Sequence, residues 1–159
     1  MNNTSNDNPN PRKGSIHNGK LKPDHLKSNS SPLSSQPRQK RVLVIDDNPD
    51  IVFTLRVGLE SDPTIQVFGF DSPVTALVEF KPNFYDLLLI DINMPLMDGF
   101  QLAQNLVRRD LNVRVCFITA GEINTEAARE VHPLKSIGCF IKKPISAEQL
   151  LRRIKAELE

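Results

Sequence analysis

Long apolar runs are missing from this sequence. No stretch reaches the length of about eighteen apolar residues that a membrane-spanning helix needs, and the N-terminus lacks the continuous apolar core of a secretory signal. We therefore expect a soluble, cytoplasmic protein. With 39% apolar residues over 159 positions, the chain has material for one hydrophobic core, which favours a single folded domain.

Cysteine is also scarce. The chain has only Cys116 and Cys139, which lie in the apolar segments VRVCFI and IGCFI. Neither belongs to a Cys-x-x-Cys motif or pairs with a histidine, so the spacing predicts neither a zinc site nor a disulfide framework. We expect two buried, reduced thiols.

Aromatic side chains are absent from residues 1–40, which hold seven Asn, seven Ser and five Pro. This segment carries seven Lys or Arg against two Asp, whereas the remainder carries thirteen against seventeen acids. So little apolar surface cannot offset the entropy of ordering the chain. We expect residues 1–40 to be a disordered basic tail that acts as a solvated tether, because its charges are scattered. Residues 41–159 would form the folded domain.

The folded part contains short apolar runs that alternate with stretches of helical period. Because the runs are apolar at successive positions, they suit parallel strands that are covered on both faces. Strands alternating with helices imply right-handed crossovers and an open α/β sheet of five parallel strands followed by five helices. The runs are RVLVI (41–45), IQVFGF (65–70), DLLLI (86–90), VRVCFI (113–118) and CFIKK (139–143).

Capping side chains mark the starts of several helices. The fourth helix is expected after Asn124, where Pro133 would end or kink it early. The predicted caps are Asn48 before Pro49, Ser72 before Pro73, and Ser146 with Gln149 in a capping box.

Reactive side chains stand at the predicted strand tips. Asp46 and Asp47 follow the first strand, Asp91 the third, Thr119 ends the fourth and Lys143 the fifth. Ligands of such sheets bind at the carboxyl ends of the strands. Three acids, a hydroxyl and an amine are therefore expected to converge on one edge.

These residue types fit phosphoryl chemistry at a metal. Adjacent carboxylates resist ionising together unless a cation is near, and hard oxygen ligands suit Mg²⁺. With the charge of Asp46 and Asp47 taken up by the metal, Asp91 could attack a phosphoryl group. Lys143 would then face the phosphoryl oxygens, and Thr119 could turn to hydrogen-bond the new phosphate.

Residues 41–159 resemble the receiver domain of two-component response regulators. The resemblance is carried by DD after the first strand, DINMPLMDG at the third, TA after the fourth and KP after the fifth, in the family's order. It implies a doubly wound, flavodoxin-like fold with strand order 2-1-3-4-5. It also implies a phosphoacceptor signalling domain rather than an enzyme.

The resemblance assigns roles to single residues. Asp91 would be the phosphoacceptor, with Thr119 and Lys143 as phosphoryl contacts. Phe140 and Thr119 would form the switch, and Gly99 would shape the loop beside the site. The Mg²⁺ ligands would be Asp46, Asp47, Asp91 and the backbone carbonyl of Asn93.

Two neighbouring lysines compete for the role in the site. Successive side chains of a strand point to opposite faces, so only one of Lys142 and Lys143 can lean toward Asp91. The resemblance places the active lysine directly before a proline. It therefore favours Lys143 and implies a cis peptide bond between Lys143 and Pro144.

The same residues also have ordinary structural interpretations. Asp46 alone could be a helix cap, and Asp-Asn-Pro is ordinary turn chemistry. Lys143 with Pro144 could simply end a strand, and Phe140 would by default be a core residue.

The function we expect is a phosphorylation-dependent switch that takes phosphate from a sensor histidine kinase or phosphotransfer protein. Because nothing follows the last helix, we expect a stand-alone receiver, of chemotaxis or phosphorelay type, that acts on an unknown target protein and not on nucleic acid. One alternative is a haloacid dehalogenase-type phosphohydrolase, which would require an acid where Asn93 stands. The other is a docking module that is independent of phosphorylation.

Overall fold

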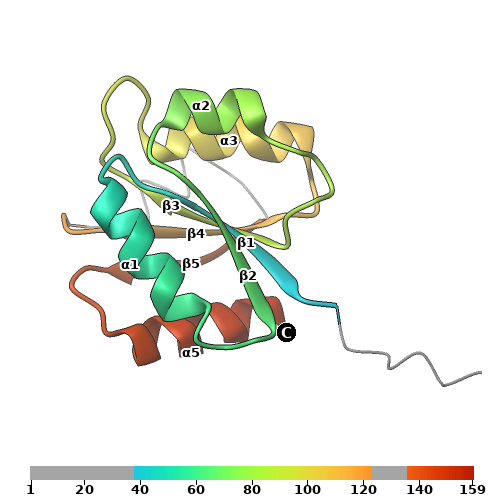
Figure 1. Ribbon diagram of the computed structural model, residues 1–159. Helices are drawn as coiled ribbons and strands as arrows, with labels where there is room; N and C mark the ends of the chain where they lie inside the picture. Colours follow the sequence, from blue (N-terminus) through green and yellow to red (C-terminus); the bar gives the residue numbers. More distant parts are fainter. Residues whose placement is uncertain (1–37, 123–135) are drawn as a thin grey trace, which may run out of the picture. The chain divides into compact units, whose positions relative to one another are not determined.

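The computed structural model describes residues 38–122 and 136–159 and contains a five-stranded parallel sheet (Figure 1). The strand order is β2-β1-β3-β4-β5, which confirms the predicted flavodoxin-like topology. Each strand begins and ends within two residues of its predicted position. The strands are β1 (Lys40–Ile45), β2 (Ile65–Phe70), β3 (Leu87–Asp91), β4 (Arg114–Thr119) and β5 (Ile137–Lys142).

In the described part of the chain, four helices connect or follow the strands: α1 (Pro49–Leu59), α2 (Pro73–Glu79), α3 (Gly99–Arg109) and α5 (Ala147–Leu158). The three predicted caps are confirmed, because the side chains of Asn48, Ser72 and Ser146 each accept a hydrogen bond from a first-turn amide. The helix predicted after Asn124, with Pro133, lies largely within 123–135, outside the described residues, and so does the tail up to residue 37. None of the helices within 38–122 and 136–159 has the length and apolar character to cross a membrane.

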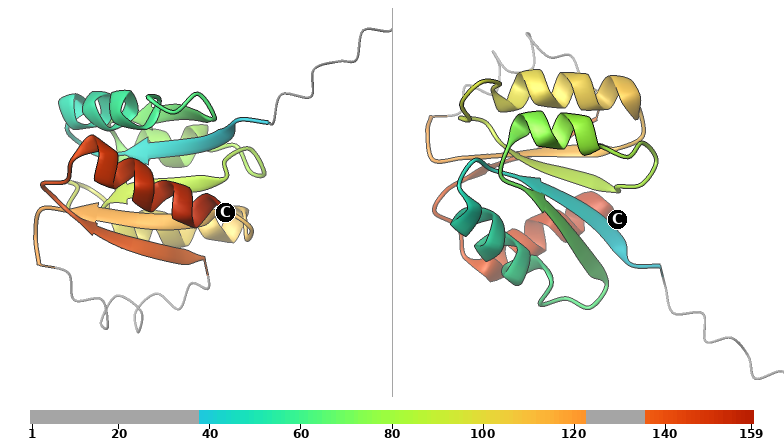
Figure 2. Two further views of the ribbon diagram at one scale, coloured as in Figure 1. Left: turned by 90° about the horizontal axis from the view of Figure 1, so that it is seen from below. Right: turned by 45° about the horizontal axis from the view of Figure 1, so that its top comes forward.

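Helices cover both faces of the sheet, α2 and α3 on one side and α1 and α5 on the other (Figures 1 and 2). This arrangement follows from the alternation of side chains along each strand. In β1, Leu43 and Ile45 belong to the cluster beneath α2 and α3, whereas Val42 and Val44 belong to the cluster beneath α1 and α5. Uninterrupted apolar runs are therefore needed, since all positions of β3 and the last four of β1 are buried.

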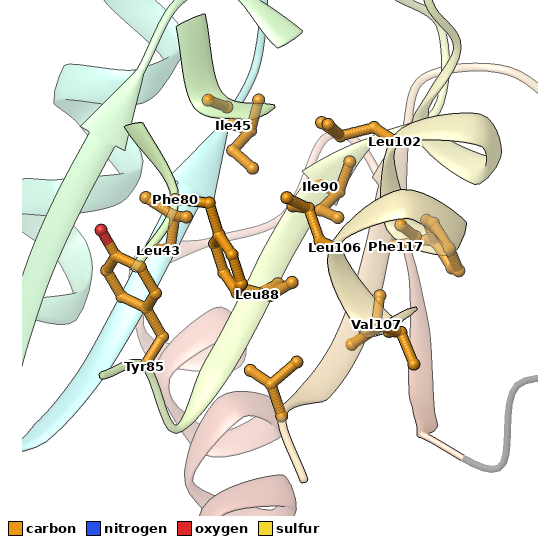
Figure 3. Packing of buried hydrophobic residues seen from close by; sticks show 14 of the residues in the cluster. Leu43, Ile45, Phe80, Tyr85, Leu88, Ile90, Leu102, Leu106, Val107 and Phe117 are labelled. Atoms are coloured by element: carbon orange, nitrogen blue, oxygen red, sulfur yellow. The ribbon is translucent and has the colours of Figure 1, made fainter. Parts of the chain in front are cut away.

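The layer under α2 and α3 is closely packed (Figure 3). Leu43 and Ile45 of β1 and Leu88 and Ile90 of β3 are fully buried, and Phe117 of β4 packs in the same cluster. Truncating one such side chain to alanine typically costs about 2 to 5 kcal/mol. The core therefore fixes the ends of β1, β3 and β4, which carry the candidate site.

The two cysteines correct an expectation drawn from the sequence. Cys116 of β4 and Cys139 of β5 are register partners and form a disulfide. The prediction of two reduced thiols is therefore wrong in this structure. The cysteines are 23 positions apart, and sequence spacing does not reveal which strands become neighbours.

Candidate functional site

The predicted site residues gather at the carboxyl ends of the central strands. Asp46 follows β1, Asp91 is the last residue of β3, and Thr119 is the last residue of β4. Lys143 follows β5, and its backbone N–H donates to the Thr119 carbonyl at 2.8 Å, which extends the β4–β5 ladder by one residue. The peptide bond between Lys143 and Pro144 is cis, as the resemblance implied.

The Lys143 ammonium joins the two buried acids. Its Nζ lies 2.5 Å from Asp46 Oδ2 and 2.9 Å from Asp91 Oδ1. Asp46 is 2% exposed and Asp91 5% exposed, so both carboxylates need a partner. Lys142 points elsewhere and pairs with exposed Glu122 at 3.2 Å. Lys143 is thus the lysine in contact with the site.

Burial, more than neighbouring charge, disfavours the ionised form of Asp91. Burial raises the pKa of Asp91, the hydrogen bond from Lys143 opposes this, and the charge of Asp46 adds to the rise. Burial disfavours the charged form of Lys143, but its hydrogen bonds to Asp46 and Asp91 outweigh that effect and raise the pKa of Lys143. A further cation would stabilise the ionised Asp91.

The donor set also bears on the expected metal. Asp47 is exposed and forms no ion pair with the other described residues. Within 38–122 and 136–159, no three His, Cys, Asp or Glu side chains are grouped so that they could hold a metal. Mg²⁺ does not require such a group, because it commonly takes one or two carboxylates and keeps several waters. Carboxylate oxygens with uncompensated charge therefore fit Mg²⁺ better than a metal that needs a full protein cage.

Thr119 is only 1% exposed, and its hydroxyl is held from two sides. Asn93 Nδ2 donates to Thr119 Oγ1 at 2.8 Å, and the Gly121 amide donates to the same oxygen at 3.1 Å. The sequence did not predict this contact of the Asn93 side chain. No spacing rule indicates it, since the partners are 26 positions apart.

Phe140 is half-buried and packs against the cluster beneath α2 and α3. Its ring stacks on Phe117 with centroids 5.4 Å apart and planes inclined by 27°. The ring of Phe117 in turn packs against that of Phe100 of α3, with centroids 4.7 Å apart. Phe117 and Thr119 are two residues apart on β4, so the ring of Phe140 packs beside the strand segment that carries the hydroxyl.

The loop from β3 to α3 passes close to the site. The Gly99 amide donates to the Ile92 carbonyl at 2.9 Å and folds the start of α3 back onto β3. A Cβ on Gly99 would collide with the carbonyl oxygen of Asp91 and lie 2.9 Å from Ile92 Cα. Glycine is therefore required for this approach. Leu96, at the turn of the loop, is 91% exposed and has a positive φ of 69°.

An apolar cavity of about 290 Å³ lies beside Lys143. It is bordered by α1 through Ile51 and Leu55 and by the connection from β5 to α5 through Pro144 and Ile145. The cavity therefore brings an apolar surface next to the charged cluster.

Comparison with known proteins assigns the family. Residues 42–155 match the response regulator receiver domain, and the chain belongs to that family. It is 31% identical over 116 residues to the heme response regulator HssR of Staphylococcus epidermidis, which covers 73% of this chain and 50% of that protein. It is 30% identical over 129 residues to the DNA-binding response regulator MtrA of Mycolicibacterium smegmatis, a match that covers 76% of this chain and 51% of that protein.

A further relative is protein-glutamate methylesterase/protein-glutamine glutaminase 2 of Rhodospirillum rubrum. It is 29% identical over 124 residues, which cover 77% of this chain and 34% of that protein. The chain thus spans about a third to a half of the length of these curated relatives. These matches establish the family of the chain. They say nothing about whether the chain shares the activities of the other parts of its relatives.

Solved structures support the fold. The non-phosphorylated HemR receiver domain from Leptospira biflexa is 27% identical and gives a TM-score of 0.67 over 76% of this chain and 95% of that one. Chemotaxis protein CheY4 of Vibrio cholerae is 22% identical with a TM-score of 0.65, over 74% of this chain and 98% of that one. At that identity the second likeness concerns the fold alone.

Proposed function

We propose that this receiver domain is a phosphorylation-dependent signalling switch with Asp91 as its phosphoacceptor. The observation that carries the proposal is the contact of Lys143 with both Asp46 and Asp91 at the carboxyl edge of the sheet. Asp91 is the acid of this cluster that lies at the tip of β3, flanked by β1 and β4. Its carboxylate is the group that would bond covalently to phosphorus.

Mg²⁺ would be held by Asp46, Asp47 and Asp91 with the backbone carbonyl of Asn93. When bound, it would neutralise charge on the phosphoryl oxygens that approach these carboxylates. Lys143 would move its ammonium from the carboxylate of Asp91 to the transferred phosphoryl group, so the positive charge stays paired in both states. Asp46 would keep its contact with Lys143 and orient the amine.

The response to phosphorylation would pass through β4 and β5. Thr119 would turn its hydroxyl to a phosphoryl oxygen, and Phe140 would move with it as the switch aromatic. The packing of Phe140 on Phe117, two residues from Thr119, supports this coupling. The changed surface would then be recognised by a downstream target protein.

The phosphodonor would be a sensor histidine kinase or a phosphotransfer protein in the cytoplasm. A macromolecular donor must place its phosphohistidine over Asp91, which requires docking contacts as well as chemistry. The apolar cavity beside Lys143 offers such a contact. We expect no direct nucleic-acid binding by this domain.

Two measurements test the function against its alternatives. Phosphotransfer from purified, radiolabelled histidine kinases should label the protein in Mg²⁺ and not in EDTA. Isothermal titration should show Mg²⁺ binding that is weakened in Asp46→Asn. A phosphorylation-independent docking module would show neither result, and a phosphohydrolase would release phosphate from small phosphoesters in many turnovers.

A further inference from the structure

The side chain of Asn93 makes a contact that the proposed chemistry does not use. Its backbone carbonyl is the expected metal ligand, while its Nδ2 reaches across to Thr119 Oγ1 at 2.8 Å. The residue itself is exposed, so water could satisfy its amide without this bond. The side chain nevertheless spans from the end of β3 to the end of β4.

The Thr119 hydroxyl is saturated as an acceptor in this arrangement. A hydroxyl oxygen offers two lone pairs, and here they receive the Asn93 amide and the Gly121 N–H. Within the described residues, no hydrogen bond connects the hydroxyl of Thr119 with the side chains of Asp46, Asp91 or Lys143. Side-chain alternation along the strands explains the separation. Thr119 is on the same face of β4 as Phe117, which lies under α2 and α3. Asp91 is on the same face of β3 as Leu89, which lies under α1 and α5.

We propose that Asn93 is a positioning residue whose side chain holds the Thr119 hydroxyl away from Asp91 in the unphosphorylated protein. We call the hydrogen bond from Asn93 Nδ2 to Thr119 Oγ1 the latch. The inference rests on the proposed function in one respect, namely that Thr119 turns to a phosphoryl group on Asp91. Breaking the bond from Asn93 is then part of switching. The strength of this bond sets how readily the resting protein reaches the active arrangement.

Gly121 keeps the latch free of obstruction. A Cβ at this position would lie 3.3 Å from Asn93 Nδ2 and 3.6 Å from Thr119 Oγ1. The first separation is tighter than most Cβ contacts, so a larger residue would push against the amide. The sequence pair Asn93 and Gly121 therefore acts as one unit on Thr119.

A double-mutant cycle in the full-length protein tests the latch without any phosphoryl group. Urea unfolding would be measured for wild type, Asn93→Ala, Thr119→Val and the double variant. A net hydrogen bond corresponds to about a two- to tenfold change in an equilibrium constant, so Asn93→Ala should shift the unfolding equilibrium by about that factor in wild type and much less in the Thr119→Val background. Equal effects in both backgrounds would overturn the latch.

Asn105→Ala is the matched control. Asn105 is half-buried on α3, and its Nδ2 donates to the Gln101 carbonyl at 2.9 Å. Asn105→Ala also loses a hydrogen bond donated by an asparagine Nδ2, of nearly the same length, but to a backbone carbonyl on α3 and not to Thr119. Its effect should be the same with and without Thr119→Val.

A titration with beryllofluoride and Mg²⁺ tests the switching role. Beryllofluoride stands in for a phosphoryl group on the aspartate and favours the active arrangement. Asn93→Ala should tighten its binding about two- to tenfold, because the latch no longer has to be broken, and should leave the affinity unchanged in the Thr119→Val background. Equal tightening in both backgrounds would mean that Asn93 acts on the phosphoryl pocket directly, which would overturn the proposal.

The two arms separate the latch from the proposed function. If wild type failed to bind beryllofluoride while the urea cycle showed coupling, the proposed function and the switching role would be contradicted, and the resting contact would stand. If wild type bound beryllofluoride but the cycle showed no coupling, the function would stand and the latch would be contradicted.

Discussion

At the scale of single residues, the site is a balance between two buried acids and one ammonium. Asp46 follows β1 and Asp91 ends the neighbouring strand β3; among the described residues, Lys143 is the one whose side chain pairs with both. Coulomb energies are large where water is scarce, so an unbalanced charge there affects stability as well as function. This balance leads to two predictions.

Asp91→Asn is expected to stabilise the protein at neutral pH by about 1 kcal/mol, an ordinary magnitude for one substitution. Burial raises the pKa of Asp91 above 3.8 despite the opposing hydrogen bond from Lys143, with a further rise from Asp46. The folded state therefore binds this proton more tightly than the unfolded chain, and stability falls as the pH rises through the raised pKa. The gain in stability of Asp91→Asn over wild type should be complete above that pKa and absent at pH values below 3.8.

Urea unfolding of wild type and Asp91→Asn across pH measures this difference. Mg²⁺ should reduce it at neutral pH by compensating the charge of Asp91. An advantage that is larger in acid than at neutral pH would contradict the charge balance described here.

Lys143→Ala should destabilise the protein, while Lys142→Ala should leave it nearly unchanged. Removing the Lys143 ammonium leaves two buried carboxylates unpaired, which costs about 3 kcal/mol in comparable cases. The pair of Lys142 with Glu122 is exposed, and exposed pairs contribute about 0 to 1 kcal/mol. Chemical denaturation measures both costs.

The two lysine variants should also differ in signalling. Lys143→Ala should still bind Mg²⁺ but lose the phosphorylation-dependent shift of the Phe140 resonances, whereas Lys142→Ala should keep it. The opposite pattern would contradict the assignment of Lys143.

Residue types at strand tips predicted three acids at one edge of the sheet. Asp46 and Asp91 meet there at Lys143, whereas Asp47 is exposed. The choice of Lys143 over Lys142 came from the resemblance. The hydrogen bond from Asn93 to Thr119 was not predictable, because it depends on side-chain rotamers at the ends of two strands. The pairing of Cys116 with Cys139 was missed because it depends on the register between β4 and β5. Both misses concern contacts that no local pattern encodes.

At the scale of elements, the close approach of α3 to β3 controls the position of Asp91. Gly99 begins α3 directly behind the Asp91 carbonyl, and Asp98 caps the helix by accepting from the Gln101 amide at 2.9 Å. Capping residues and proline positions predicted helix starts well, because these preferences are local. How closely α3 approaches β3 could not be predicted from the sequence and is seen only in the structure.

Gly99→Ala is predicted to cost about 3 kcal/mol, at the upper end for overpacking, and to lower phosphate uptake. The added Cβ meets backbone atoms of Asp91 and Ile92, which cannot move without shifting the site. Thermal unfolding and phosphorylation by acetyl phosphate measure the two effects.

Gly58→Ala on α1 is the control. Its Cβ would lie 3.2 Å from the Ala147 Cβ, while alanine gains about 1 kcal/mol in helix propensity, so the net change should be small. If Gly99→Ala were as mild as Gly58→Ala, the proposed constraint on the β3–α3 loop would be wrong.

At the scale of the whole molecule, the sequence divides into a basic segment and a more acidic remainder. The fold was predictable from residue 41 onward because each strand run is apolar at successive positions and each described helix start carries a capping signal. The boundary at residue 40 was one residue late, since Lys40 already pairs with Ile65 in β1 and β2.

Deleting residues 1–37 is expected to leave the melting temperature and phosphate uptake nearly unchanged. The segment has too few apolar side chains to contribute a core, and the cut spares Arg38 with its contact to Asp86. Amide exchange in the full-length protein should be unprotected over these residues. A large loss of stability on truncation would instead assign the segment a structural role.

The central claim is that Asp91 accepts a phosphoryl group with the help of Mg²⁺. The most direct measurement is the intact mass of wild type and Asp91→Asn after incubation with acetyl phosphate and Mg²⁺. We expect one phosphoryl adduct on wild type, none on Asp91→Asn, and none on wild type in EDTA. An equal adduct on Asp91→Asn, or an adduct on wild type that persists in EDTA, would contradict it.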